Sequence, residues 1–152
     1  MALLNIRTDK DPILRKTSRP VIEVTPRILT LLDDMVETMR RANGCGLAAV
    51  QVGVLRRVVV IEVEEGTVYE MINPEIIESE GHQEEAEGCL SLPDRWGVTS
   101  RPMRVTVKYL DRKGKERTLT GEGLLARAIC HETDHLDGKP FIDVMIREAE
   151  ED

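Results

Sequence analysis

Apolar residues recur at helical spacing in one early segment of the chain. They fall three or four positions apart, on one face of an α-helix, at Leu29, Leu32, Met35, Val36 and Met39. Thr25 is a suitable N-cap residue and Pro26 suits the first helical position, whereas Asn43-Gly44 is a typical helix end. We therefore predict a helix that begins at Pro26 and ends before Asn43.

Alternating apolar and polar residues predict β-strands through the middle of the chain. The expected strands cover residues 58–63, 67–72, 103–110 and 115–120. Gly66 marks a turn between the first two, and residues 111–114 (Asp-Arg-Lys-Gly) form a turn between the last two. Each pair of strands is expected to run antiparallel.

A second helix is expected near the end of the chain. It starts near Glu122, and Gly138 is placed as its C-terminal cap with Pro140 just beyond. Because helices and strands do not alternate regularly, we predict an α+β fold. Small antiparallel or mixed sheets would wrap around this second helix, and the N-terminal helix would pack alongside. Residues 147–152 are acidic and poor in apolar side chains, so we expect a solvated tail without a function.

The composition is typical of a small globular protein. With 152 residues, the chain is expected to fold as one domain spanning residues 1–152. Aromatic residues make up only 3% of it, so the core must be built from Leu, Ile, Val, Met and Ala. The net charge of -7 excludes a general attraction to nucleic acid or to an anionic membrane.

Two further features favour the cytoplasm. The apolar run at residues 1–5 is too short for a signal peptide, and no segment approaches the roughly 20 apolar residues of a membrane span. Three cysteines is an odd number, and without a secretory signal we expect reduced thiols and no disulfide framework. Each cysteine is then either a ligand or a small buried hydrophobe.

The most informative motif is His131-Glu132-Thr133-Asp134-His135, within the second expected helix. Two histidines four residues apart lie on one face of a helix, where both can bind one metal ion. Glu132 is placed to accept a proton from a metal-bound water. Because the chain has only three histidines, chance is a weak explanation of this spacing. We therefore predict a hydrolytic metal site.

Such a site needs a third protein ligand and an open position. His82 lies among glutamates and a glutamine and is expected on the surface. Cys89 is the better candidate, because glycine precedes it and Pro93 ends its short segment, so that a thiolate would complete a Cys-His-His set. The alternative is that Cys89 is a small buried hydrophobe, whereas Cys130 is expected to be a buried thiol.

The chain resembles the peptide deformylase family in three segments of the right order and separation. They are Gly44–Gln51 (GCGLAAVQ), Glu87–Ser91 (EGCLS) and His131–His135 (HETDH). Asp11–Arg15 and Leu136–Gly138 are similar to the family as well, so the resemblance covers nearly the whole chain. It implies an enzyme that removes the formyl group from the N-terminal formyl-methionine of nascent polypeptides and releases formate.

The resemblance also implies roles for individual residues. The metal ligands would be Cys89, His131 and His135. The family implies Fe²⁺ as the native metal, with Zn²⁺ often found after purification in air. Glu132 would act as general base and then as general acid. The side-chain amide of Gln51 and the backbone N–H of Leu90 would stabilise the negative charge that gathers on the formyl oxygen.

Seven residues are expected to contact the peptide: Gly44, Cys45, Gly46, Trp96, Leu124, Arg127 and Ala128. The glycine-flanked segment resembles the family segment whose backbone pairs with an extended peptide. Leu124 and Ala128 lie on the helical face of His131, where they would line a pocket for methionine, although core packing is an equal alternative. By the same resemblance Glu87 and Arg101 would pair and brace the cysteine segment, unless they are independent surface charges.

The last residues of the sequence are acidic, so we expect no docking on the ribosome through the long basic C-terminal extension that some members of the family use. Any transient ribosome contact would need another surface, and we expect a monomer without nucleic-acid or membrane partners. Two other classes of protein are alternatives. A zinc endopeptidase would have to take its third ligand from Glu148, Glu150 or Glu151, and a non-catalytic metal- or peptide-binding module would have no use for Glu132.

Overall fold

The computed structural model describes residues 2–8 and 10–149. Within them the helices are α1 (Pro26–Arg41) and α2 (Leu124–Leu136), with short 3-10 helices η1 (Pro12–Arg15), η2 (Ala49–Val52) and η3 (Phe141–Asp143). The strands are β1 (Gly46–Ala48), β2 (Val58–Glu64), β3 (Thr67–Glu80), β4 (Gln83–Cys89), β5 (Leu92–Arg101), β6 (Arg104–Leu110), β7 (Glu116–Glu122) and β8 (Met145–Glu148).

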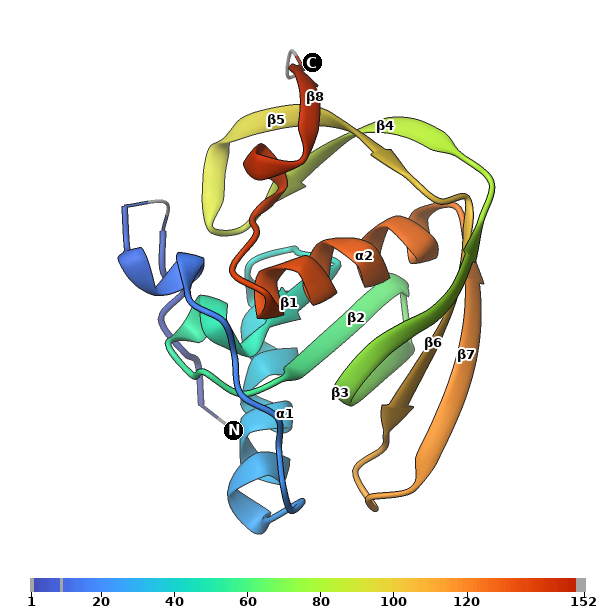
Figure 1. Cartoon of the computed structure of the whole chain (residues 1–152). Helices are drawn as coiled ribbons and strands as arrows, with labels where there is room; N and C mark the ends of the chain where they lie inside the picture. The colour runs from blue at the N-terminus through green and yellow to red at the C-terminus, as the bar shows by residue number, and fades with distance from the viewer. Residues whose placement is uncertain (1, 9, 150–152) are drawn as a thin grey trace.

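These strands form two antiparallel sheets around α2. One sheet has the order β1-β2-β3-β6-β7 and the other the order β4-β5-β8. Helix α2 crosses the middle of the molecule, with β4, β5 and β8 on one side and β1 and β2 on the other, while α1 packs against β1 and β2 (Figure 1). The predicted α+β fold with sheets around the second helix is therefore confirmed.

Helix α1 follows its sequence signals. The Thr25 hydroxyl accepts a hydrogen bond from the Ile28 N–H, and Pro26 occupies the first turn. The fully buried side chains of this helix are Leu32, Met35 and Met39. Burial of each contributes about 1.5–3 kcal/mol of hydrophobic stabilisation. They pack against apolar residues of β1 and β2, so α1 supports the segment that carries Gly46.

One side of helix α2 packs against apolar side chains of the five-stranded sheet. Its buried apolar residues pack in one cluster with Val59 and Ile61 of β2 and Val105 and Val107 of β6. It starts at Leu124, two residues after the expected start. At its other end Gly138 has a φ of 73°, and a side chain there would collide with the carbonyl of Arg15, which explains the glycine.

The second sheet was not predicted from the sequence. Strand β3 runs on to Glu80, eight residues past its expected end, and β4 and β5 follow where no strand was assigned. The reason is that β4 does not alternate apolar with polar residues. Its buried positions include Gln83 and Glu87, so a polar face is turned inward.

The expected tail also needs a correction. Residues 145–148 form β8, which pairs with β5 through Gly97 and Glu148, and through Val98 and Arg147. The first two residues of the expected tail are exposed, as predicted, but they belong to a sheet because a strand edge of β5 is available there. Residues 150–152 lie outside the described residues. Among the described residues, none of the helices has the length and apolar character needed to cross a membrane.

Candidate metal centre and active site

Three potential metal ligands converge between α2 and the end of β4. His131 and His135 project from α2 and Cys89 is the last residue of β4, and a donor atom of each lies within 4.8 Å of the other two. The Cys89 sulfur is 3.3 Å from the His135 Nε2 atom. His131 is 8% exposed and His135 is fully buried, so these ligands are shielded from bulk water.

The donor set fits a metal ion. Thiolate and imidazole groups bind zinc and ferrous iron, at about 2.3 Å for sulfur and 2.0–2.1 Å for nitrogen. A histidine ligand is oriented when its other ring nitrogen donates a hydrogen bond. Here the His131 Nδ1–H donates to the Glu87 carboxylate at 2.9 Å, which leaves its Nε2 atom for a metal.

Glu87 belongs to a buried network that links β4, β5 and α2. Arg101 donates two hydrogen bonds of 3.0 Å to the Glu87 carboxylate and one of 2.6 Å to Asp134. Thr99 donates a further hydrogen bond to Glu87. Burial alone would raise the pKa of Glu87, but the hydrogen bonds from His131 and Arg101 outweigh it and lower the pKa to about 2. Glu87 is therefore ionised and holds the imidazole in place.

Glu132 is buried beside strand β1. It is 4% exposed, and its Oε1 atom makes no hydrogen bond within the described part of the chain. Burial raises the pKa of this carboxyl from 4.5 to about 7. Its Oε2 atom lies where a side chain at residue 46 would be, so Gly46 is required for the close approach of β1 to this carboxylate.

Gln51 reaches the ligand cluster from η2. Its side-chain oxygen accepts a hydrogen bond of 2.9 Å from the Ala48 N–H, which fixes the amide. Its nitrogen donates to the Ser91 hydroxyl at 3.0 Å and to the Cys89 sulfur at 3.4 Å. Gln51 is 1% exposed, so the amide group is a fixed, buried donor next to Cys89.

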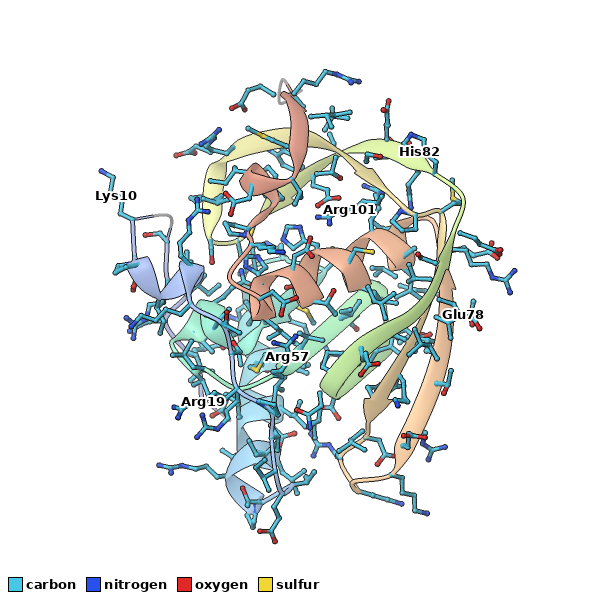
Figure 2. All side chains as sticks on the ribbon, in the orientation of Figure 1. Lys10, Arg19, Arg57, Glu78, His82 and Arg101 are labelled. Atoms are coloured by element: carbon cyan, nitrogen blue, oxygen red, sulfur yellow. The ribbon has the colours of Figure 1, made fainter. Side chains whose placement is uncertain are left out.

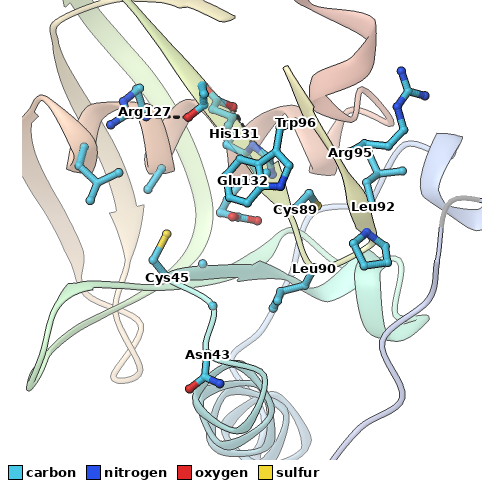
Figure 3. Close-up of a pocket in the computed structure, with 18 residues that line it drawn as sticks. Asn43, Cys45, Cys89, Leu90, Leu92, Arg95, Trp96, Arg127, His131 and Glu132 are labelled. Carbon is cyan, nitrogen blue, oxygen red and sulfur yellow. Dashed lines mark hydrogen bonds and ion pairs between the residues drawn. The ribbon is translucent and has the colours of Figure 1, made fainter. Parts of the chain in front are cut away.

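A pocket of about 430 Å³ opens onto this cluster. Figure 3 shows Trp96 above Cys89 and Glu132, with Cys45 and Arg127 to one side and Leu90 to the other. Every residue expected to contact a peptide lines this pocket: Gly44, Cys45, Gly46, Trp96, Leu124, Arg127 and Ala128. The indole of Trp96 lies against Gly88, and Arg127 donates a hydrogen bond of 3.4 Å to the Ala86 carbonyl.

A family model for polypeptide deformylases matches residues 3–151 of this chain. The chain belongs to the polypeptide deformylase family. It is 56% identical over 152 residues to the peptide deformylase of Thermoanaerobacter pseudethanolicus, which covers 100% of this chain and 95% of that protein. It is 57% identical over 152 residues to the peptide deformylase of Acetivibrio thermocellus, with 100% and 89% covered.

Solved deformylase structures share this architecture. A peptide deformylase from Legionella pneumophila aligns with a TM-score of 0.92 at 44% identity, covering 95% of this chain and 86% of that one. A peptide deformylase from Ehrlichia chaffeensis in complex with actinonin aligns with a TM-score of 0.93 at 41% identity, covering 95% and 90%. The family consists of metal-dependent enzymes, which agrees with the Cys-His-His cluster.

The endopeptidase alternative finds no support in the position of its candidate ligands. Glu148 lies on β8 and pairs with Arg95, outside the Cys-His-His cluster, and Glu150 and Glu151 lie outside the described residues. His82 is exposed, as expected, and contacts Ser100 and Glu84. Cys130 is buried, and burial raises the pKa of its thiol to about 11, so it is an inert thiol in this deformylase.

Some contacts in this deformylase site were missed by the sequence analysis. Glu87 and Arg101 were expected to brace the cysteine segment, and they also fix His131 and reach Asp134. The partners of the Gln51 amide, Ala48 and Ser91, were not expected either. The signal for Asp134 was present, since it lies three residues after His131 and is therefore close to it on one helix face.

Proposed function

We propose that this chain removes the N-formyl group from nascent formyl-methionyl peptides at a metal ion held by Cys89, His131 and His135. The family membership supports this reaction. The assignment of the residues is supported by the convergence of these three ligands beside Glu132 in one pocket. When bound, the ion polarises the formyl oxygen and makes a water nucleophilic at neutral pH.

Glu132 would handle the proton. Its buried carboxylate faces the pocket and has no hydrogen-bonding partner at Oε1 among residues 2–8 and 10–149, so it can take a proton from the attacking water. The leaving group is the amino nitrogen of methionine, which must gain a proton before it departs. Glu132 would return the proton to that nitrogen, as acid–base reversal requires.

The negative charge that forms on the formyl oxygen needs fixed donors. We assign this role to the side-chain amide of Gln51 and the backbone N–H of Leu90, which follows Cys89 in the chain. The support is that the Gln51 oxygen is already bound by the Ala48 N–H, so its nitrogen must point toward Cys89. A donor held in this way costs no reorganisation during the reaction.

Replacing Gln51 by alanine is expected to lower kcat about 10²–10³-fold, with a smaller change in KM, because one such donor stabilises the transition state by about 2.7–4 kcal/mol. Formate release measured over a range of substrate concentrations separates the two constants. Gln83→Ala is the matched control, since Gln83 is also a buried glutamine but donates to Pro102 and Gly123 outside the pocket. Equal kcat values for Gln51→Ala and the parent enzyme would refute the assignment.

The pocket suits an extended peptide. It lies between β1 and β4, both of which end their sheets, so their outer edges offer unpaired backbone groups. A peptide backbone can add to such an edge as a further strand. We propose that residues 44–46 pair with the substrate backbone, and that Leu124, Ala128, Trp96 and the stem of Arg127 enclose the methionine side chain.

Incubation with formyl-Met-Ala-Ser tests the proposed function. The metal-loaded protein should release formate and leave a free methionine amino group, without cleaving the bonds between residues. Internal cleavage would instead support the endopeptidase, and binding without any product would support a non-catalytic module. We also propose that the enzyme acts as a monomer in the cytoplasm, where nascent chains are made.

We propose Fe²⁺ as the native metal. Thiolate and imidazole suit both Fe²⁺ and Zn²⁺, but only iron is redox-active. Aeration with dilute peroxide is therefore expected to abolish most activity of the Fe²⁺-loaded enzyme and little activity of the Zn²⁺-loaded enzyme within the same time. Formate release before and after exposure measures the difference. If the Fe²⁺-loaded enzyme kept its activity through this treatment, the iron assignment would be wrong.

A further inference from the structure

The two histidines of the cluster are held in different ways. Glu87 orients the ring of His131 through its Nδ1 atom. The corresponding Nδ1 atom of His135 is buried and makes no hydrogen bond within the described part of the chain. A histidine ligand is normally oriented by such a bond. Apart from the contact between its Nε2 atom and the Cys89 sulfur, the His135 ring has no polar partner among the described residues, so its direction depends on where the backbone of α2 places it.

The backbone around His135 is the C-terminal end of α2, where carbonyl groups lack partners inside the helix. The Asp134 carbonyl accepts from the N–H groups of residues 137 and 139, and the His135 carbonyl accepts from Gly138. The carbonyl of Leu136, the residue after the ligand, is bound from outside. It accepts a hydrogen bond of 2.7 Å from the Ser18 N–H and one of 3.2 Å from the side chain of Arg57.

Arg57 joins this helix end to two other segments. One guanidinium nitrogen donates to the carbonyls of Leu136 and Ser18, at 3.2 and 3.3 Å, and another donates to the Asp137 carboxylate at 3.0 Å. The side chain is 19% exposed. Figure 2 shows Arg57 beside the end of α2 that carries the second histidine.

Arg57 is itself held firmly. Its N–H donates to the Arg19 carbonyl at 2.9 Å, and its carbonyl accepts from the Asn73 N–H at 2.7 Å. The planar guanidinium is suited to this position, because it presents several donors in fixed directions. Its positive charge also lies at the negative end of the α2 dipole. Both features favour a fixed helix end.

We propose that Arg57 is a positioning residue for the metal site, which fixes His135 by clamping the C-terminal end of α2. This inference rests on the proposed metal site and adds a residue that touches neither metal nor substrate. His131 is oriented through its side chain by Glu87, whereas His135 is oriented through its backbone by Arg57.

Zinc release from the folded protein tests this role. Zn²⁺-loaded wild type, Arg57→Met and Arg57→Lys are mixed with excess chromogenic chelator at 25 °C, and the release rate is recorded. Arg112→Met is the matched control, because Arg112 also bridges two elements, through Glu70 and Asp33, but lies away from α2. Melting of the metal-free proteins reports stability separately, and the visible absorption of the Co²⁺-loaded proteins reports ligand geometry.

Arg57→Met is expected to release zinc about tenfold faster than wild type and to change the Co²⁺ spectrum, as loss of a residue supporting a ligand does. Arg57→Lys should fall between them, since one ammonium cannot span all three acceptors. Arg112→Met should stay within twofold of wild type. If Arg57→Met does not fold, Arg57→Gln carries its expectation, and Arg57→Lys keeps the intermediate one.

Two results would overturn the inference. In the first, zinc release and the Co²⁺ spectrum of the Arg57 variants match wild type although their melting temperatures fall. That result would show that Arg57 has a purely structural role. In the second, Arg112→Met accelerates release as much as Arg57→Met does. A wild-type protein that binds no zinc or cobalt would instead contradict the proposed metal site itself.

Discussion

Replacing Glu132 by glutamine is expected to lower kcat for formyl-Met-Ala-Ser about 10²–10⁴-fold while metal content stays unchanged. The reason is that one carboxylate is assigned both proton transfers, to and from the reacting groups. Glutamine has nearly the same shape and keeps the contact with Gly46, but it cannot accept a proton. Formate release and elemental analysis of the same sample measure both quantities.

The control for this substitution is Glu122→Gln. Glu122 is an exposed carboxylate at the end of β7, just before α2, and should have no effect on kcat. Full activity in a Glu132→Gln enzyme with normal metal content would show that another group moves the proton. Loss of the metal together with the activity would show that Glu132 acts on the metal site and not on the proton.

The largest loss of stability is expected for Glu87→Gln. Glu87 and Arg101 are each 7% exposed, so the substitution leaves a buried guanidinium without its main counter-charge. Breaking a buried pair in this way costs about 3–5 kcal/mol of unfolding free energy. It also weakens the hydrogen bond that orients His131, which should lower metal affinity about 10–100-fold.

Urea unfolding of the metal-free protein and a metal competition titration measure these two effects. Glu80→Gln is the control, because Glu80 pairs with Arg104 at the surface and contributes little. Replacing both partners, as in Glu87→Gln with Arg101→Met, should destabilise the protein less than Glu87→Gln alone, since the buried guanidinium is gone and the charge that loses its partner, Asp134, is 27% exposed. An unfolding free energy equal to that of wild type for Glu87→Gln would contradict the assigned network.

The parts of the fold with strong local signals could be predicted. Helix α1 has an N-cap at Thr25, a proline in its first turn and apolar residues at helical spacing, and it lies where these predict. Strand β6 alternates clearly and β7 follows it after the turn at residues 111–114, and both lie within one or two residues of their expected bounds. These elements bury apolar side chains on one face only, so their pattern is visible in the sequence.

The second sheet could not be predicted, because the residues that it buries are those of the active site. Strand β4 turns Glu87 inward to His131, and β5 turns Thr99 and Arg101 inward to Glu87. Buried polar residues remove the alternation on which strand prediction depends. Strand β8 is missed for another reason, since its residues Met145–Glu148 are mostly exposed and depend on the edge of β5.

The reactive part of the site was easier to predict than its supports. The spacing of His131 and His135 is a property of one helix and is visible in the sequence. Cys89 was a candidate from its glycine- and proline-flanked segment, but only the family resemblance made it the expected ligand, because nothing local shows that the end of β4 reaches α2. Arg57 has no signal at all, since it acts through the carbonyl of Leu136, 79 residues away in the chain.

X-ray absorption at the metal edge tests the central claim most directly. For the Zn²⁺-loaded enzyme we predict one sulfur ligand at about 2.3 Å and two imidazole nitrogens at about 2.0–2.1 Å, with a further oxygen from water. Cys89→Ala should lose the sulfur contribution. A spectrum of the unmodified enzyme without any sulfur neighbour would contradict the claim that Cys89 joins His131 and His135 at one ion.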